Sequence, residues 1–130
     1  MAETDLERNK HNVVAFLTRA VNDKQPEEAA AEYIGPVYIQ HNPMAPDGVE
    51  AFLGFFRGAA QQYPEMRIEI KRVLADGDLV AVHSRFAFSS EERGNAVVDI
   101  FRLDENGKIV EHWDVVQPVP ESSANDNGML

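Results

Sequence analysis

The spacing of apolar residues changes from a helical period to a strand period near residue 66 of this chain. Before that point, an apolar stripe at helical spacing predicts an amphipathic helix over residues 5–22. Thr4 and Glu7 have the spacing of a capping box at its start. The residues of the stripe are Val13, Phe16, Leu17, Ala20 and Val21. This helix must bury its apolar face against another element.

Two further helices are expected before the change of period. Pro26 predicts the start of a shorter helix that runs to Ile34. A short extended piece at residues 37–40 and an irregular loop at 41–48 follow. Asp47, with Glu50 three residues later, predicts the cap of a third helix that Pro64 ends. Three N-terminal helices are therefore expected.

Strands are expected from Met66 onward, where apolar and charged residues alternate. The alternation slips at Lys71-Arg72, which predicts a β-bulge. A strand over residues 79–88 precedes a long hairpin over residues 97–119, whose turn contains Gly107. The pattern predicts an α+β fold in which the helices cover one face of a strongly bent antiparallel sheet.

The last three strands are apolar in both alternation phases, so both faces of the sheet should be covered. In a chain of 130 residues a second subunit is the expected cover, which predicts a homodimer through the sheet. The length fits a single domain, placed at residues 1–118. Residues 119–130 are polar and unpatterned and are expected to form a flexible tail.

The amino-acid composition excludes several kinds of site and partner. The chain has no cysteine, so disulfides, thiolate metal sites and a cysteine nucleophile are excluded. A formal net charge of −10, without clustered Lys or Arg, argues against a nucleic-acid partner. No apolar run approaches the roughly 18 to 20 residues that span a bilayer, and five of the first ten residues are charged, unlike a secretory signal. A cytoplasmic protein with no membrane partner is expected.

Several segments, in this order, carry a resemblance to SnoaL-like proteins of the nuclear transport factor 2-like superfamily. They are Tyr38-Ile39-Gln40-His41-Asn42-Pro43, Val82-His83-Ser84, Val98-Asp99-Ile100-Phe101-Arg102 and the run from Gly107 to Asp114. The resemblance covers roughly residues 8–118. It implies a cone-shaped α+β barrel with an open interior for a small hydrophobic ligand. The superfamily includes enzymes of different reactions and non-catalytic domains, so function has to be argued from the site.

Asp99 is the leading candidate for catalysis. It lies between Val98 and Ile100 in an apolar strand, on the face shared with Phe101. Burial in a pocket would raise its pKa toward the range useful for proton transfer, and the resemblance implies an acid/base carboxylate in the pocket. His83, on the neighbouring strand, is the expected proton-transfer partner. The alternatives are an Asp99 that faces solvent or pairs with an arginine, and a His83 that is a structural core residue.

Other residues are expected to bind the substrate. His41 and Asn42 lie in the loop at the expected mouth of the cone and could hydrogen-bond a substrate oxygen, or merely cap the loop. Trp113, in phase with Ile109, Glu111 and Val115, is expected on the pocket wall or, alternatively, in the core. Phe101 is a further candidate for substrate binding, and Asp114 is a weaker second carboxylate. His11 and His112 are expected in surface or structural roles. A zinc or iron site from His41, His83 and Asp99 lacks any close ligand pair, so no metal is expected.

Matched to these residues, the resemblance implies a cofactor-independent enzyme that uses acid/base chemistry on a small hydrophobic carbonyl compound. Asp99 and His83 would remove a proton next to the carbonyl, while His41 or Asn42 binds the developing oxyanion. Aldol-type cyclisation, isomerisation and dehydration share this logic. One rival is a non-catalytic domain that binds a small hydrophobic ligand. Another is a protein-interaction module, which predicts an interior filled by side chains.

Overall fold

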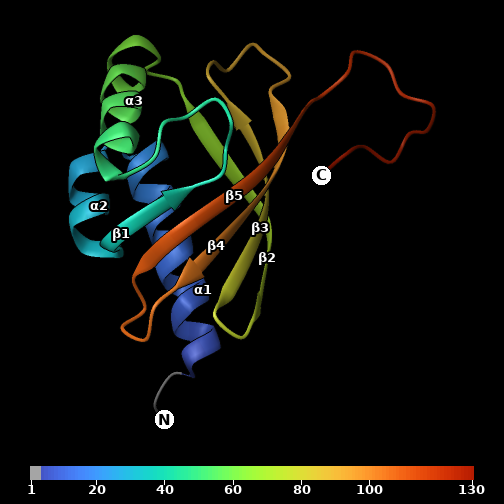
Figure 1. The fold of residues 1–130 in the computed structure, drawn as a ribbon. Helices are drawn as coiled ribbons and strands as arrows, with labels where there is room; N and C mark the ends of the chain where they lie inside the picture. Colours follow the sequence, from blue (N-terminus) through green and yellow to red (C-terminus); the bar gives the residue numbers. More distant parts are fainter. Residues whose placement is uncertain (1–3) are drawn as a thin grey trace.

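The computed structural model describes residues 4–130 and has the predicted α+β class (Figure 1). The first three residues of the predicted domain lie outside this range. Within residues 4–130 the chain forms three α-helices, a π-helical turn and five strands. In chain order these are α1 (Asp5–Leu17), η1 (Thr18–Asn22), α2 (Pro26–Tyr33), β1 (Ile34–Gln40), α3 (Val49–Gln62), β2 (Arg67–Asp76), β3 (Leu79–Ala87), β4 (Asn95–Leu103) and β5 (Ile109–Pro118). Strand β1 comes before α3, so the helices are not consecutive.

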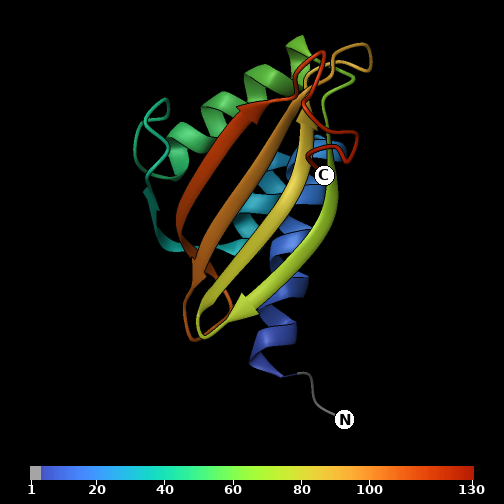
Figure 2. The same cartoon turned by 90° about the vertical axis from the view of Figure 1, so that its right-hand side faces the viewer.

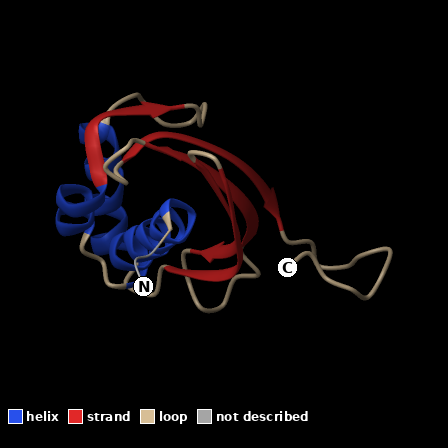
Figure 3. Ribbon diagram, turned by 90° about the horizontal axis from the view of Figure 1, so that it is seen from below, coloured by secondary structure: helices blue, strands red, loops and turns tan. Residues whose placement is uncertain are grey.

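The strands form one sheet in the order β1-β5-β4-β3-β2. Neighbours pair antiparallel except β1, which adds to β5 in parallel. The helices lie on one face of the sheet (Figure 2). Viewed from below, the sheet curves around them, so that they occupy its concave side (Figure 3). The main core lies between this concave face and the apolar stripe of α1, which includes Val13 and Phe16.

Helix α1 begins as predicted, whereas the predicted cap of α3 is wrong. Thr4 Oγ1 accepts a hydrogen bond from the Glu7 backbone N–H at 3.1 Å, and the capping box is complete. Helix α3 has Gly48 at its N-cap, with φ of 93°. Asp47 Oδ1 instead accepts from the Gln40 backbone N–H at 2.8 Å. Asp47 therefore ties the loop to the end of β1.

The predicted bulge and hairpin are both present. The β2–β3 register shifts between Ile70 and Arg72, at the predicted slip. Gly107 closes the β4–β5 turn with φ of 75°, a conformation that side chains rarely adopt. A Cβ at Gly107 would also lie 2.8 Å from Arg8 Nε on α1. This turn is thus packed directly against the first helix.

Cross-strand register decides which side chains face the helices. One row of the concave face crosses three strands: Asp99 on β4 is directly opposite Val82 on β3 on one side and Asp114 on β5 on the other. The next row on the same face contains Ser84, Val97 and Val116. The residues that alternate with these along each strand have their side chains on the outer face of the sheet.

Beyond β5 the chain forms no helix or strand and extends away from the sheet (Figure 1). Among residues 4–130, no helix combines the length and apolarity needed to cross a membrane.

Candidate active site

A cavity of about 300 Å³ lies between the concave face of the sheet and the helices. Its wall is mostly aromatic and aliphatic, with contributions from both ends of the chain. The apolar lining includes Phe16, Val21, Phe52, Phe56, Ile68, Phe86, Phe88, Val97 and Phe101. A cavity of this size, with a few polar groups in an apolar wall, is typical of a small-molecule site.

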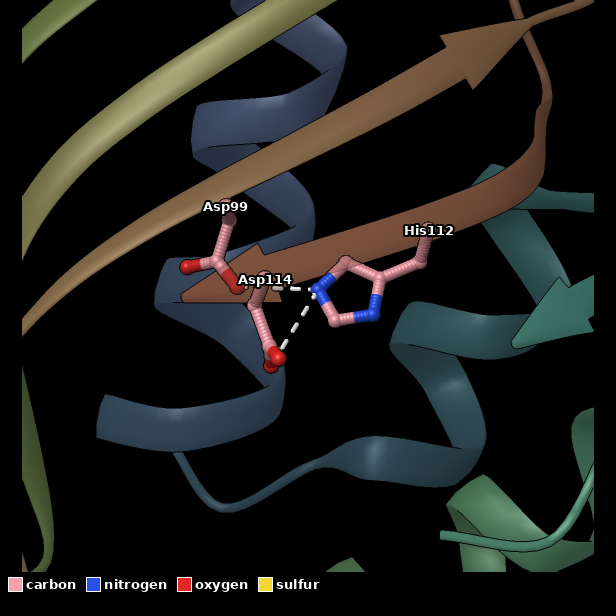
Figure 4. Close-up of side chains that lie close together, drawn as sticks. All are labelled: Asp99, His112 and Asp114. Atoms are coloured by element: carbon pink, nitrogen blue, oxygen red, sulfur yellow. Dashed lines mark hydrogen bonds and ion pairs between the residues drawn. The ribbon is translucent and has the colours of Figure 1, made fainter. Parts of the chain in front are cut away.

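Three ionisable side chains meet in one wall of this cavity (Figure 4). Asp99 projects from β4, and His112 and Asp114 project from β5. Their side chains are at most 13% exposed. His112 Nε2 lies 2.8 Å from Asp99 Oδ1 and 3.8 Å from Asp114 Oδ2. One imidazole nitrogen therefore faces two carboxylates in a largely apolar environment.

Gln40 determines which nitrogen of His112 carries a proton. Gln40 Oε1 accepts hydrogen bonds from the backbone N–H groups of His41 and Asn42, each at 3.0 Å. Two N–H donors require an acceptor, which identifies this atom as the amide oxygen. The same oxygen lies 2.8 Å from His112 Nδ1, so Nδ1–H must donate to it. In neutral His112, Nε2 is therefore the unprotonated nitrogen and faces Asp99.

Asp99 and His112 consequently compete for one proton. With Nδ1–H fixed, the 2.8 Å contact holds either a protonated Asp99 that donates to Nε2 or an imidazolium that donates to the carboxylate. Burial raises the pKa of Asp99, and the nearby charge of Asp114 raises it further, while the hydrogen bond with His112 opposes this shift. The net shift is upward, so the Asp99 carboxyl holds a proton more readily than it would in water.

The second carboxylate is held by the loop that follows β1. Asn42 Nδ2 donates to both oxygens of Asp114, at 2.8 and 3.0 Å. Asn42 Oδ1 accepts from the Met44 backbone N–H at 2.8 Å, which fixes the orientation of the amide. Met44 also lines the cavity and is 90% exposed, so the loop borders the opening.

Tyr38 adds a neutral hydroxyl to the cavity wall. Burial raises its pKa strongly, and the charges of Asp99 and Asp114 raise it further. Tyr38 Oη accepts a 3.5 Å hydrogen bond from Gln40 Nε2, which leaves its own O–H available to a ligand oxygen. The site thus combines a proton-sharing pair with a hydrogen-bond donor.

A family model for the SnoaL-like domain matches residues 13–112, which contain both members of the proton-sharing pair. The chain belongs to the SnoaL-like family.

Relatives and solved structures agree with this assignment. The "Probable cyclase otaY" of Aspergillus carbonarius is 31% identical over 106 residues, which cover 78% of this chain and 82% of that protein. TsrD from Streptomyces laurentii has a TM-score of 0.71 at 20% identity, over 88% of this chain and 91% of that one. A candidate ketosteroid isomerase from Kribbella flavida has a TM-score of 0.70 at 21% identity, over 98% and 88%. The two structures show the fold.

Four of the residues predicted for the site of this SnoaL-like chain line the cavity. They are Asp99, Asn42, Phe101 and Asp114. Asp99 shares its face with Phe101, as the period-two count predicted. Phe101 lies against the His112 ring, with ring centres 4.8 Å apart. The catalytic and binding roles of these residues remain predictions.

The predicted pairing of His83 with Asp99 is wrong. His83 pairs with Val98 on β4, whereas Val82 is opposite Asp99, so His83 lies on the outer face of the sheet. Its Nδ1 contacts the Arg72 guanidinium there. His112, expected in a surface or structural role, occupies the position next to Asp99 instead.

The predicted placements of His41 and Trp113 are also wrong. Trp113 is opposite Ile100, on the outer phase of the sheet, and its ring stacks on His41 at 4.8 Å. His41 Nε2 lies 2.7 Å from Glu111 Oε2. Hydrogen bonds from His41 and Arg102 hold the pKa of Glu111 below its ordinary value. These residues brace the loop from outside the cavity and do not line it.

Sequence reasoning missed Gln40, Tyr38 and His112 as site residues. All three lie within segments that carried the family resemblance. For the two residues of β1, the missing fact was the parallel pairing of β1 with β5, in which Gln40 is the partner of His112. For His112, it was the register shift in the β4–β5 hairpin, which sets the face of β5.

Within residues 4–130, one cluster of side chains could hold a metal ion, and it consists of Asp99, His112 and Asp114. One ligand atom from each lies within 4.8 Å of the others. Carboxylate and imidazole ligands suit several divalent metals. The predicted set of His41, His83 and Asp99 is not formed, because both histidines face away from Asp99.

Proposed function

We propose that this SnoaL-like protein is an enzyme that uses acid/base chemistry on a small hydrophobic carbonyl compound. The observation that carries the proposal is the buried Asp99–His112 pair, 2.8 Å apart, in the wall of an apolar cavity. Such a pair can accept or return a proton without water as intermediary. We also propose that the curved sheet and the helices form a cone whose open interior is this cavity.

In the proposed mechanism Asp99 is the base, and it acts from the form of the pair in which His112 carries the shared proton and Asp99 is a carboxylate. Its Oδ1 faces His112, which leaves Oδ2 for the substrate. Oδ2 removes a proton from the carbon next to the carbonyl, and that C–H electron pair becomes part of an enolate. Tyr38 O–H donates a hydrogen bond to the enolate oxygen, because its raised pKa keeps it protonated. Asp99 then gives up the proton in the second half of the reaction, to an atom that depends on the fate of the enolate.

The fate of the enolate distinguishes the possible reactions. Attack on a second carbonyl gives an aldol ring closure, in which Asp99 returns its proton to the new alkoxide. Return of the proton to another carbon gives isomerisation. Loss of a neighbouring hydroxyl, which takes up the Asp99 proton and leaves as water, gives dehydration. Relatives and fold neighbours are named as cyclases and isomerases, which supports this class of chemistry. The site residues act without a cofactor in every one of these reactions.

The proton-abstraction step can be tested without knowing the natural substrate. In D₂O, the wild type should accelerate hydrogen–deuterium exchange at the carbon next to the carbonyl of 1-tetralone, followed by NMR. Asp99→Asn should lower the enzyme-dependent rate by about 10²- to 10⁴-fold, because Asn cannot act as the base. His83→Ala is the matched control and should exchange at the wild-type rate, since His83 lies on the outer face.

The rival function is a non-catalytic domain that binds a small hydrophobic ligand. It predicts that 1-tetralone binds and that exchange stays at the buffer rate. Exchange that survives Asp99→Asn would contradict the assigned base. Exchange that disappears in excess EDTA would contradict the cofactor-independent mechanism and assign the three-residue cluster to a metal. The cavity itself argues against the interaction module, which predicted a filled interior.

A further inference from the structure

Ser84 on β3 carries a buried hydroxyl that nothing in the fold satisfies. The residue is fully buried, and its Oγ is the buried side-chain polar atom within residues 4–130 that has no hydrogen-bond partner. An unpaired buried hydroxyl costs folding free energy, because it loses its hydrogen bonds to water. Such a group in a native protein calls for an explanation.

Ser84 is one of the residues that line the cavity that contains Asp99. Val82 is directly opposite Asp99, and Ser84 is two residues further along β3, opposite Val97. Ser84 and Asp99 are thus diagonal neighbours on the concave face, with a separation of about 7–8 Å. A ligand bound at Asp99 that extends along the strands toward Asn95 would pass Ser84.

The surroundings of Ser84 restrict the chemistry of that ligand. The cavity wall next to Ser84 is apolar: Val97 and Val116 are in the same cross-strand row, and Phe86 is two residues further along β3. No lysine or arginine is among the described residues that line the cavity, and two carboxylates are. An anionic group would therefore be repelled and left without a counter-ion. A neutral oxygen, either a carbonyl or a hydroxyl, can pair with Ser84.

We infer that Ser84 forms a second binding subsite, specific for a neutral oxygen on the part of the substrate remote from the reacting carbonyl. The inference rests on the proposed function, which places the reacting carbonyl at Asp99. It narrows the substrate class to neutral, largely cyclic carbonyl compounds that carry a second carbonyl or hydroxyl oxygen at the far side of the ring system. In the free protein the Ser84 hydroxyl has no partner among residues 4–130 and lowers the folding stability; in the complex it would bind the substrate oxygen.

Two probes that differ by one oxygen test the subsite by calorimetric titration. The wild type should bind 6-hydroxy-1-tetralone about tenfold more tightly than 1-tetralone, since one hydrogen bond to a buried partner distinguishes them. Ser84→Ala should bind both with similar affinity. The free Ser84→Ala protein should melt no lower than the wild type, because the hydroxyl makes no internal hydrogen bond to lose. A serine with a structural role would lower the melting temperature instead.

Val97→Ala is the matched control, because Val97 is the cross-strand partner of Ser84 and lines the same part of the cavity. It should change the affinities of both probes while their ratio stays as in the wild type. Ser84→Cys keeps a similar shape with a weak donor and should also lose the preference, which covers a failure of the alanine variant to fold.

A wild type without the tenfold preference, whether it binds both probes equally or neither, overturns the inference. So does a Ser84→Ala protein that retains the preference. The proposed function is judged separately, by exchange of 1-tetralone, which lacks the second oxygen. Exchange without any preference between the probes would overturn the subsite and leave the acid/base mechanism standing.

Discussion

At the scale of single residues, Asp99 loses most of its contact with water and gains a hydrogen bond to one imidazole nitrogen. Burial raises the pKa of the carboxyl, and the hydrogen bond with His112 only partly compensates. A carboxylate in this position is a stronger base than one in water. Gln40 binds Nδ1 of His112 and thereby fixes the orientation of the ring, so that Nε2 faces the Asp99 carboxyl.

The raised pKa predicts how stability changes with pH. The folded protein holds the Asp99 proton more tightly than the unfolded chain does. The stabilising contribution of protonated Asp99 is therefore complete below the ordinary pKa of 3.8 and is lost as pH rises through the folded value. Asp99→Asn cannot lose that proton. The free energy of unfolding of Asp99→Asn relative to wild type should therefore rise from pH 4 toward neutrality, as measured by urea denaturation across a pH series.

A constant difference between the two proteins across this range would contradict a raised pKa of Asp99. A difference that falls with increasing pH would show that the carboxylate is stabilised in the folded state. His83→Ala is again the control, since its removal changes a contact with Arg72 on the outer face and leaves the Asp99 environment intact.

At the scale of elements, the parallel addition of β1 to β5 completes the site. It places Gln40 beside His112, where Gln40 Oε1 also accepts from two backbone N–H groups of the loop. The loop, in turn, holds Asp114 through Asn42. Positions of the imidazole and of both carboxylates therefore depend on one edge strand and the loop that follows it.

Replacement of Gln40 tests this dependence. Gln40→Leu removes the acceptor for His112 Nδ1–H and for the two loop N–H groups, so the ring can reorient. The exchange rate should fall about tenfold to a hundredfold, and stability should fall by about 1 kcal/mol. Gln40→Glu keeps the acceptor oxygens and should retain more of the exchange rate than Gln40→Leu. Equal losses in both variants would contradict the positioning role.

The sequence predicted these elements better than it predicted their partners. Local spacing was enough for the helices, the bulge and the turn at Gly107, since these depend on neighbouring residues. The face of a strand depends on register, and a shift of one residue moves every side chain to the other face. The prediction paired His83 with Asp99 because their strands are neighbours, but the residue directly opposite Asp99 is Val82.

A register shift near the start of β5 also changed which side chains of this strand face the cavity. The β4–β5 register shifts between Arg102 and Leu103, and Trp113 faces outward while His112 and Asp114 line the cavity. The pairing of β1 with β5 joins segments some 70 residues apart in the chain, for example Gln40 and His112 at a separation of 72. Such long-range contacts have no local signal, which is why Gln40 was missed. His112 is only 13 residues from Asp99 in the predicted hairpin, and it was missed because its strand face depends on the register shift.

At the scale of the whole molecule, the sheet has two unlike faces. The concave face forms the core and the cavity. The outer face exposes apolar side chains, with Val115 73% and Val98 40% exposed, directly opposite one another on β5 and β4. Leu74 on β2 is 67% exposed on the same face, since it is opposite Ala81. Apolar patches of this kind mark interaction surfaces more often than free surface.

We propose that two copies of the chain associate through this outer face, as the apolar alternation in both phases suggested. Size-exclusion chromatography with light scattering should give twice the mass of 14.5 kDa for the wild type. Val115→Asp should give the monomer, because a carboxylate at the centre of an apolar interface is costly to bury. The formal charge of −10 on each chain opposes association, so added salt should strengthen the wild-type dimer by screening that repulsion. Glu121→Lys, in the segment beyond β5, is a control of surface charge and should remain dimeric. A wild type that is monomeric in high salt at high concentration would overturn the proposal, and the exposed valines would then be free surface.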